Sequence, residues 1–175
     1  KDKVLPIGNI LCFRAPMEVL ADGMIDQEDI DKQEFIWSDD AINFLWEIPI
    51  LDNPLGAVAY QRLLNTHIAN ILGSAKYLDC PVIMDGDDIM VQKEHNQGGI
   101  VQQEGKASVS ITYVKDGVAL GHTAINITAG KKAPAFAFST NFDDDQANQF
   151  MSDVQKTFYE LNDDMFVATS KVIIK

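Results

Sequence analysis

A hairpin expected from residues 106–128 gathers hydroxyl side chains and one lysine on a single face of a sheet. Asp116-Gly117 is a two-residue turn signal flanked by β-forming residues, so the strands before and after it should pair. The expected cross-strand pairs are Lys115–Val118, Ile111–His122, Ser110–Thr123, Ser108–Ile125 and Lys106–Ile127.

Alternation along the two strands divides this hairpin into two faces. The small polar face holds Lys106, Ser108, Ser110, Thr112, Gly121 and Thr123. The bulkier face holds Ala107, Val109, Ile111, Tyr113, Leu120, His122, Ala124 and Asn126. A small polar face with a lysine at its end either lies exposed to water or supports a bound small molecule. The pattern alone favours exposure.

The other polar residues match no common catalytic or metal-binding motif. Asp87 and Asp88 are adjacent at the start of an expected strand, so they point to opposite faces and form no two-carboxylate metal site by themselves. Two interpretations of Gly86-Asp87-Asp88 stay open: one of the aspartates helps to bind Mg²⁺, or the three residues form a solvated turn. The three histidines, His67, His95 and His122, fit no zinc spacing. On a strand, His122 is more typical of a hydrogen-bonded core residue than of a base.

Composition excludes several classes of protein. The chain has 175 residues, of which 46% are hydrophobic, and this predicts one domain over residues 1–175. Its net charge of −12 repels phosphate backbones, so we expect no nucleic-acid partner. No apolar run approaches the roughly 20 residues of a membrane span. Cys12 and Cys80 lie far apart and form no CxxC motif, which favours a reduced, cytoplasmic chain.

The elements expected around the hairpin define an α+β fold. Residues 7–14 are expected to form a strand closed by Ala15-Pro16, and residues 22–34 an exposed loop or short helical turn. Ser38 is expected to cap a helix that ends before Pro49.

Two further helices are expected, with strands between them. One begins at Pro54 after the Asn53 cap and stops at Gly73, and its apolar residues recur at helical spacing. Strands separated by turns fill residues 81–128. The last helix follows Asp143 with an acidic first turn, and the tail after Leu161 is either helix or strand. This order predicts an antiparallel or mixed sheet with helices packed on one face.

Several motifs in a fixed order resemble an uncharacterised family, domain of unknown function three-six-six. They are FRAPMEV, QRLL within the long expected helix, GDDIMV, GKASVSI and H-x-x-INI. The resemblance runs from about Ile10 to Thr128, and the tail SKVIIK is also similar to the end of that family.

A more distant resemblance connects the chain to biotin and lipoate protein ligases. GDDIMV, GKASVSI and TAINIT are similar, in order, to three consecutive strand motifs of those ligases. The resemblance implies the biotinyl/lipoyl-ligase fold, which class II synthetases share. It also implies that Lys106 meets an acyl carboxylate and adenylate, and that Asp88 lies near nucleotide phosphates and a metal. Lys106 and Asp88 are thus the expected catalytic residues, and Asp88 is the expected metal ligand.

The chain also departs from the ligase pattern. It lacks the glycine- and arginine-rich loop that those ligases close over the adenylate, Asp87 replaces their asparagine, and Val109 replaces a glycine. The eighteen positions from Asp88 to Lys106 are more than the ligases use, so residues 92–104 are expected to be an inserted hairpin.

Two functions follow as hypotheses. The first is an enzyme, a ligase or an acyl or nucleotidyl transferase, that binds a nucleotide with Mg²⁺ or a small carboxylic acid on the polar face. Its expected ligand contacts are Arg14, Arg62, Ser108, Ser110 and Thr123, of which Arg14 and Arg62 are the chain's two arginines. The alternative is a non-catalytic module that binds a small molecule or assembles as a homodimer. A homo-oligomer is expected as well.

Overall fold

The computed structural model describes residues 7–20, 22–25, 27–32, 35–95 and 101–171. Its strands are β1 (Asn9–Val19), β2 (Ile36–Ile48), β3 (Val82–Asp85), β4 (Asp88–His95), β5 (Val101–Lys106), β6 (Ser108–Lys115) and β7 (Val118–Thr128). Its helices are α1 (Gln27–Lys32), α2 (Pro54–Gly73) and α3 (Asp144–Thr169).

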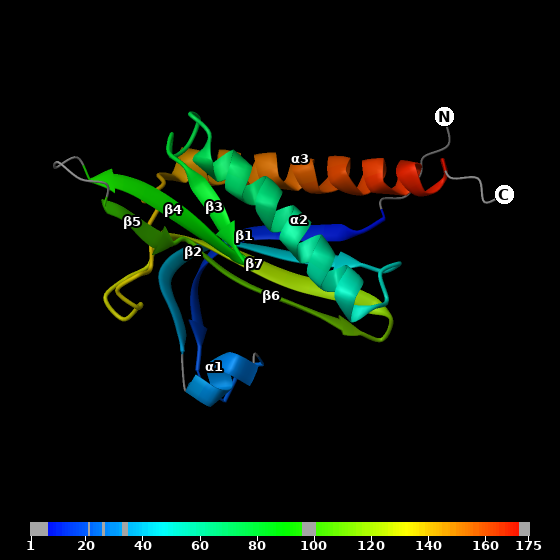
Figure 1. Cartoon of the computed structure of the whole chain (residues 1–175), viewed down its shortest axis with the longest axis horizontal. Coiled ribbons are helices and arrows are strands. Elements are labelled where there is room, and N and C mark those ends of the chain that lie inside the picture. The colour runs from blue at the N-terminus through cyan, green and yellow to red at the C-terminus, as the bar shows by residue number, and fades with distance from the viewer. Residues whose placement is uncertain (1–6, 21, 26, 33–34, 96–100, 172–175) are drawn as a thin grey trace.

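The strands form two antiparallel sheets. The larger has the order β1-β2-β7-β6, and the smaller has the order β3-β4-β5. The sheets meet where Ala107, between β5 and β6, donates its N–H to the Ile89 carbonyl at 2.9 Å. Helices α2 and α3 lie on the same side of the four-stranded sheet, whereas α1 lies apart, beyond the bent ends of β1 and β2 (Figure 1). The expected α+β class, with helices packed on one face, is confirmed.

The helix predicted from Ser38 is wrong, because that segment is the central strand β2. Its core-facing residues recur at every second position, which is the strand period, and β2 pairs with both β1 and β7. The Ser38 hydroxyl caps no helix and donates instead to the carbonyls of Asp40 and Thr128. The residues of this core-facing set are Ile42, Phe44, Trp46 and Ile48.

Strand β1 continues past Ala15-Pro16, where the sequence predicts its end. The pairing with β2 shifts register between Ala15 and Met17, so Pro16 lies at an irregularity of the ladder. A proline is tolerated there because no regular ladder hydrogen bond needs its missing N–H. Met17 packs on the face of the sheet away from the main core, with Ala41 and Ala124.

The two long helices begin as predicted. The Asn53 side chain accepts from the Gly56 N–H ahead of Pro54, and Asp143 forms a capping box with Gln146. Phe150, Val154 and Phe158, in the apolar stripe of α3, are fully buried. The segment after Leu161, left open between helix and strand, continues α3 as far as Thr169.

The predicted hairpin register is confirmed from Lys115–Val118 to Ser108–Ile125. The predicted pair of Lys106 with Ile127 is wrong, because Lys106 ends β5 and pairs with Met90 in the smaller sheet. Residues 92–95 and 101–104 pair as a hairpin. Its status as an insertion relative to the ligases stays a prediction.

Apart from Lys106, which belongs to the smaller sheet, the small polar face lies under α2, contrary to the exposure that the pattern favoured. Ser108 and Thr123 are fully buried, and Ser110 is half-buried. An isolated hairpin contains no information on which of its faces a distant helix will cover.

Gly121 provides a test of this packing. An added Cβ there would lie 2.1 Å from two ring carbons of Trp46, which itself is buried. We expect Gly121→Ala to lower the free energy of unfolding by about 1–3 kcal/mol in urea titrations, as overpacking does. Gly23→Ala is the control, because its Cβ would meet nothing nearer than 3.5 Å and should change stability by less than about 0.5 kcal/mol. Equal stability of the two variants would contradict this packing.

Candidate functional site

A layer of hydrogen bonds joins α2 to the polar face of the hairpin. Thr123 Oγ1 donates to Asn65 Oδ1 at 2.8 Å, and Asn65 Nδ2 donates to Ser110 Oγ at 3.1 Å. Gln61 Nε2 also donates to Ser110 Oγ, at 2.8 Å. Asn65 Nδ2 reaches the Asp87 carbonyl as well, at 2.9 Å, and so attaches the turn between β3 and β4 to the helix. Buried polar groups need such partners, and here they find them within the protein.

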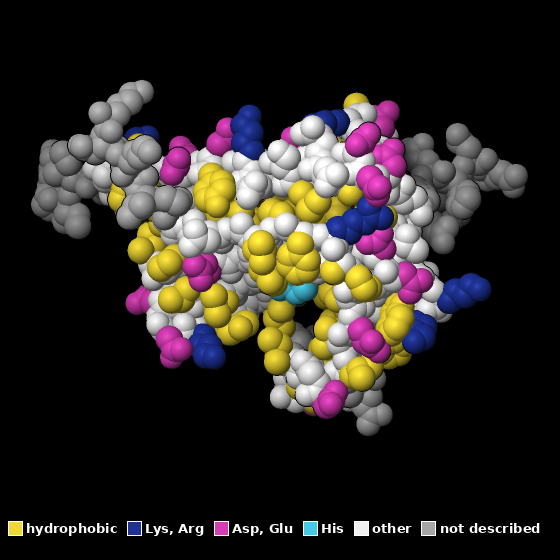
Figure 2. Space-filling model, turned by 180° about the vertical axis from the view of Figure 1, so that it is seen from behind, with side chains coloured by type: hydrophobic (Ala, Val, Ile, Leu, Met, Phe, Trp, Pro, Cys, Tyr) yellow, Lys and Arg dark blue, Asp and Glu magenta, His cyan; other side chains and the backbone are white. Residues whose placement is uncertain are grey.

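The opposite face of the larger sheet is open and forms a cavity of about 480 Å³. Val109, Ile111, His122 and Asn126 of the bulkier hairpin face line it. Its other walls come from the ends of β1 and β2, from residues 23–25 and from residues 134–137. Figure 2, from behind, shows a hollow with hydrophobic side chains around it and a histidine at its edge. A volume of this size suits a small organic molecule.

Part of the cavity lining is apolar. Met17, Ile36 and Val109 line the cavity as an apolar floor, and they pack on Ala41 and Ala124, which are fully buried beneath them in a cluster separate from the main core. A ligand that covers this floor would exchange water for apolar contacts, at about 25 cal/mol per Å² of buried apolar surface.

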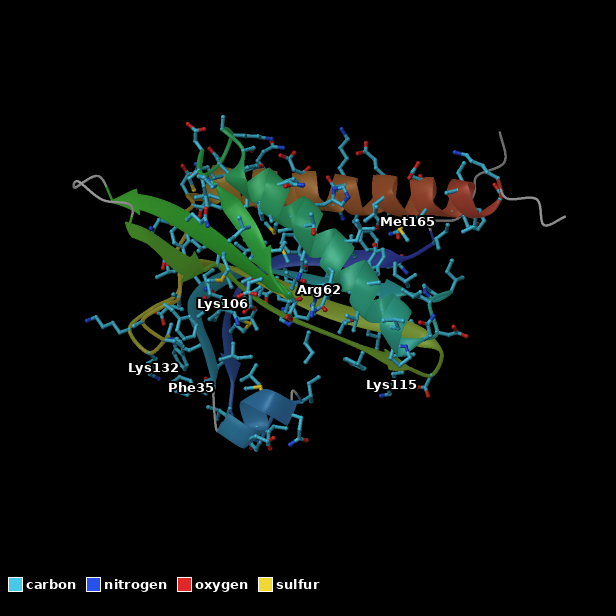
Figure 3. The ribbon with its side chains drawn as sticks, in the orientation of Figure 1. Phe35, Arg62, Lys106, Lys115, Lys132 and Met165 are labelled. Atoms are coloured by element: carbon cyan, nitrogen blue, oxygen red, sulfur yellow. The ribbon has the colours of Figure 1, made fainter. Side chains whose placement is uncertain are left out.

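One end of the cavity is charged. Lys106 Nζ lies 2.9 Å from Asp88 Oδ1, and each of the two side chains is about 30% exposed. Both residues line the cavity, as does Asp87, whose carboxylate lies 3.5 Å from the Arg62 guanidinium. Arg62 and Lys106 lie toward the middle of the molecule in Figure 3, and Lys115 lies at the far end of β6. The pairing of Lys106 with Asp88 joins the two residues that the ligase resemblance implies as catalytic.

The pKa of Asp88 is raised above its ordinary value, because burial disfavours the charged carboxylate. The hydrogen bond and positive charge of Lys106 act in the opposite direction, whereas the negative charges of Asp87 and Asp85 raise the pKa further. Asp88 therefore accepts a proton more readily than an exposed aspartate does.

The remaining candidate ligand contacts are divided between this cavity and other places. Ser108 and Ser110 lie on the edge strand β6 and so also border the cavity, although their hydroxyls bond within the protein: that of Ser108 accepts from the Ile89 N–H, and that of Ser110 accepts from Gln61 and Asn65. Thr123 lies under α2 and does not line the cavity. Arg14 lies elsewhere in the fold and forms ion pairs with Asp40 at 2.6 Å and with Asp144, at the start of α3, at 2.5 Å. Arg14 thus connects β1 and β2 to α3.

Two polar residues of the cavity, His122 and Asn126, were not among the predicted ligand contacts. His122 Nε2 lies 2.9 Å from Asn43 Oδ1, and burial lowers the pKa of this histidine. Asn126 is 4% exposed, and its Oδ1 has no hydrogen-bond partner among the described residues. Both residues belong to the bulkier hairpin face. The sequence does not show that this face is open, because that depends on α2 covering the other face.

The described part of the chain contains no group of three or more His, Cys, Asp or Glu side chains placed to hold a metal ion. Within those same residues, no helix combines the length and the apolar character needed to cross a bilayer. A metal at Asp88 would therefore have to bring ligands of its own, as Mg²⁺ does when it arrives with phosphates.

The two sheets, the helices on one side and the cavity on the other define an α+β domain with a lipoate-ligase-like fold. LipL1 of P. falciparum, solved in complex with lipoate, superposes with a TM-score of 0.51 and 16% sequence identity. The match covers 90% of this chain and 49% of LipL1, so the chain spans about half the length of that protein.

The chain belongs to the family Domain of unknown function (DUF366), which matches residues 6–173. A protein of unknown function from Pyrococcus horikoshi has a similar structure, with a TM-score of 0.79 and 22% identity, over 99% of this chain and 85% of that one. No protein with a curated description matches the sequence. The expected family is confirmed, and the similar structures establish the fold alone.

The Lys106–Asp88 pair can be tested by titration. Lys106→Met removes the groups that lower the pKa of Asp88, so this pKa should rise further, as measured by carboxyl ¹³C NMR. A carboxyl whose pKa is higher in the folded than in the unfolded state lowers the free energy of unfolding as pH rises above about 3.9, the ordinary aspartate pKa. This fall should be larger in Lys106→Met than in the unchanged protein. Well below pH 3.9 Asp88 is protonated in both states, so it should make no such contribution. Lys115→Met, at the exposed far end of β6, should leave the titration unchanged. An unchanged or lower pKa in Lys106→Met would show that the pair does not form.

Thr123→Val tests whether the buried hydroxyl layer is structural. The variant keeps the side-chain shape but leaves Asn65 Oδ1 without its donor, so the free energy of unfolding should fall by about 1–3 kcal/mol. Thr66→Val, on the exposed side of α2, should change it by less than about 0.5 kcal/mol. Urea titrations of both variants give the comparison, and a stable Thr123→Val protein would argue against the structural role.

Proposed function

We propose that this domain binds a small carboxylic acid in the cavity, with the carboxylate at Lys106 and the apolar body over the floor formed by Met17, Ile36 and Val109. The observation that carries the proposal is the combination of this apolar floor with a lysine at one end of the same cavity. LipL1, whose fold this chain shares, was solved in complex with lipoate, which is a molecule of that class.

The charges at the polar end support exchange of one carboxylate for another. Asp88 occupies the position beside Lys106 that a ligand carboxylate would take. Because burial raises the pKa of Asp88, this residue accepts a proton more readily than an exposed aspartate when a second carboxylate approaches Lys106. The protonated Asp88 then donates a hydrogen bond in place of repelling the ligand. Arg62 offsets the charge of Asp87 nearby.

A second candidate function is acyl or nucleotidyl transfer with a Mg²⁺-bound nucleotide. The observation that favours it is the closeness of Asp87 and Asp88 to Lys106 at one end of the cavity. Mg²⁺ is commonly held by one or two carboxylates together with substrate phosphates. In this reaction Asp88 would ligate the metal, and Lys106 would stabilise charge that develops at the acyl or phosphoryl centre. A non-catalytic module would bind the acid alone.

The proposal is tested by thermal shift with octanoate and lipoate. At one hundred times its dissociation constant a ligand adds about 2.7 kcal/mol, or roughly 5–10 °C for a chain of this size. Lys106→Met should weaken binding more than about tenfold, because a hydrogen bond to a charged group is lost. Lys106→Arg should restore part of the affinity, and Lys115→Met should bind like the unchanged protein.

The outcomes separate the two candidate functions. A shift with the acid alone that depends on Lys106 supports binding of a carboxylic acid. A further shift with ATP that needs Mg²⁺ and is lost in Asp88→Asn supports the transferase reaction. No shift with either acid, or an undiminished shift in Lys106→Met, would overturn the proposal.

A further inference from the structure

The tautomer of His122 is fixed by its neighbour Asn43. Asn43 is 3% exposed, and its Nδ2 lies 3.2 Å from the Ala41 carbonyl oxygen and 3.4 Å from that of Ala15. The amide must place its nitrogen toward these two carbonyls, because its oxygen would be repelled there. Asn43 Oδ1 therefore faces His122 Nε2, at 2.9 Å, and accepts a hydrogen bond from it.

A neutral His122 with its proton on Nε2 has an unprotonated Nδ1. Burial favours the neutral ring, since it lowers the pKa of His122. Nδ1 is then an acceptor with a free lone pair, and it makes no hydrogen bond within the part of the chain that the structure describes. The ring lines the cavity, so the cavity contains an acceptor that a ligand donor can satisfy.

This acceptor lies far from the charged end of the cavity. The Asn126 N–H donates to the carbonyl of Ala107, which follows Lys106, so Asn126 marks the charged end along β7. His122 lies four residues before Asn126 on the same face of this strand, about 13 Å away at the usual rise of a β-strand. Val109 of β6, which pairs with Ala124 between them, also lines the cavity. Asn126, Val109 and His122 thus give the cavity a polar, an apolar and a polar part in that order.

We propose that the ligand is a carboxylic acid whose apolar body ends in an O–H or N–H donor, and that this donor bonds to His122 Nδ1. The inference rests on the proposed binding of an acid at Lys106 and specifies the far end of the ligand. It favours ω-hydroxy acids, or acids that end in an N–H-bearing ring, over acids with a plain alkyl or dithiolane end. Asn43 is a positioning residue in this account, because it acts through His122.

The experiment compares octanoate, 8-hydroxyoctanoate and 8-methoxyoctanoate by isothermal titration calorimetry. The hydroxy acid should bind about fivefold more tightly than the other two, the effect of one hydrogen bond. The methoxy acid keeps the oxygen but has no proton to donate. In His122→Phe the three acids should bind alike. Independently of any variant, ¹⁵N NMR of the histidine rings should show His122 protonated at Nε2, and only the hydroxy acid should shift its Nδ1 signal.

Failure of this inference can be distinguished from failure of the proposed function. Equal binding of all three acids with the unchanged protein would overturn the inference and leave acid binding at Lys106 in place. A His122 ring protonated at Nδ1 would also overturn it. Absence of binding by all three acids would overturn the proposed function, and the inference with it.

Discussion

The hydrogen bonds of Asn65 determine which face of the larger sheet is open. This fully buried side chain accepts from Thr123, donates to Ser110 and donates to the carbonyl of Asp87. It thereby attaches α2 to β6, to β7 and to the turn that precedes Asp88. Because no other group in this layer contacts all three parts, the positions of the helix, the sheet and the charged turn depend on one another through Asn65.

The consequence is a molecule with a packed side and an open side. On the packed side, the small hydroxyl residues of the hairpin are satisfied by α2, and the aromatic residues of α3 fill the core. On the open side, the same strands present Val109, His122 and Asn126 to the cavity. Lys106 and Asp88 reach that cavity because β5 ends beside β6, at Ala107. The fold therefore places a charged pair at the end of an apolar floor.

The elements whose signals are local could be predicted from the sequence. Capping residues and apolar stripes predicted α2 and α3, and the Asp116-Gly117 turn predicted the register of β6 and β7. The helix predicted from Ser38 failed because Ile42, Leu45 and Trp46 also fit a helical spacing. The pairing of β2 with strands at both edges outweighed that local preference.

The candidate site was predictable in part. The ligase resemblance indicated Lys106 and Asp88, and the structure places them 2.9 Å apart. The open face could not be deduced, since the choice between the two hairpin faces depends on the contact of α2 with strands about 45 residues or more away along the chain. For the same reason the sequence could not show that Arg14 lies outside the site, because its ion pair with Asp144 joins residues 130 positions apart.

The most direct test of acid binding on the open face is an NMR titration that follows the methyl groups of both sides of the sheet. Octanoate should shift the methyl signals of Met17, Val109 and Ile111, which line the cavity or its apolar floor. The methyl signals of Leu64 and Ile68, buried on the packed side, should stay unchanged. Shifts confined to the packed side, or no shifts at saturating octanoate, would contradict the assignment of this cavity as the ligand site.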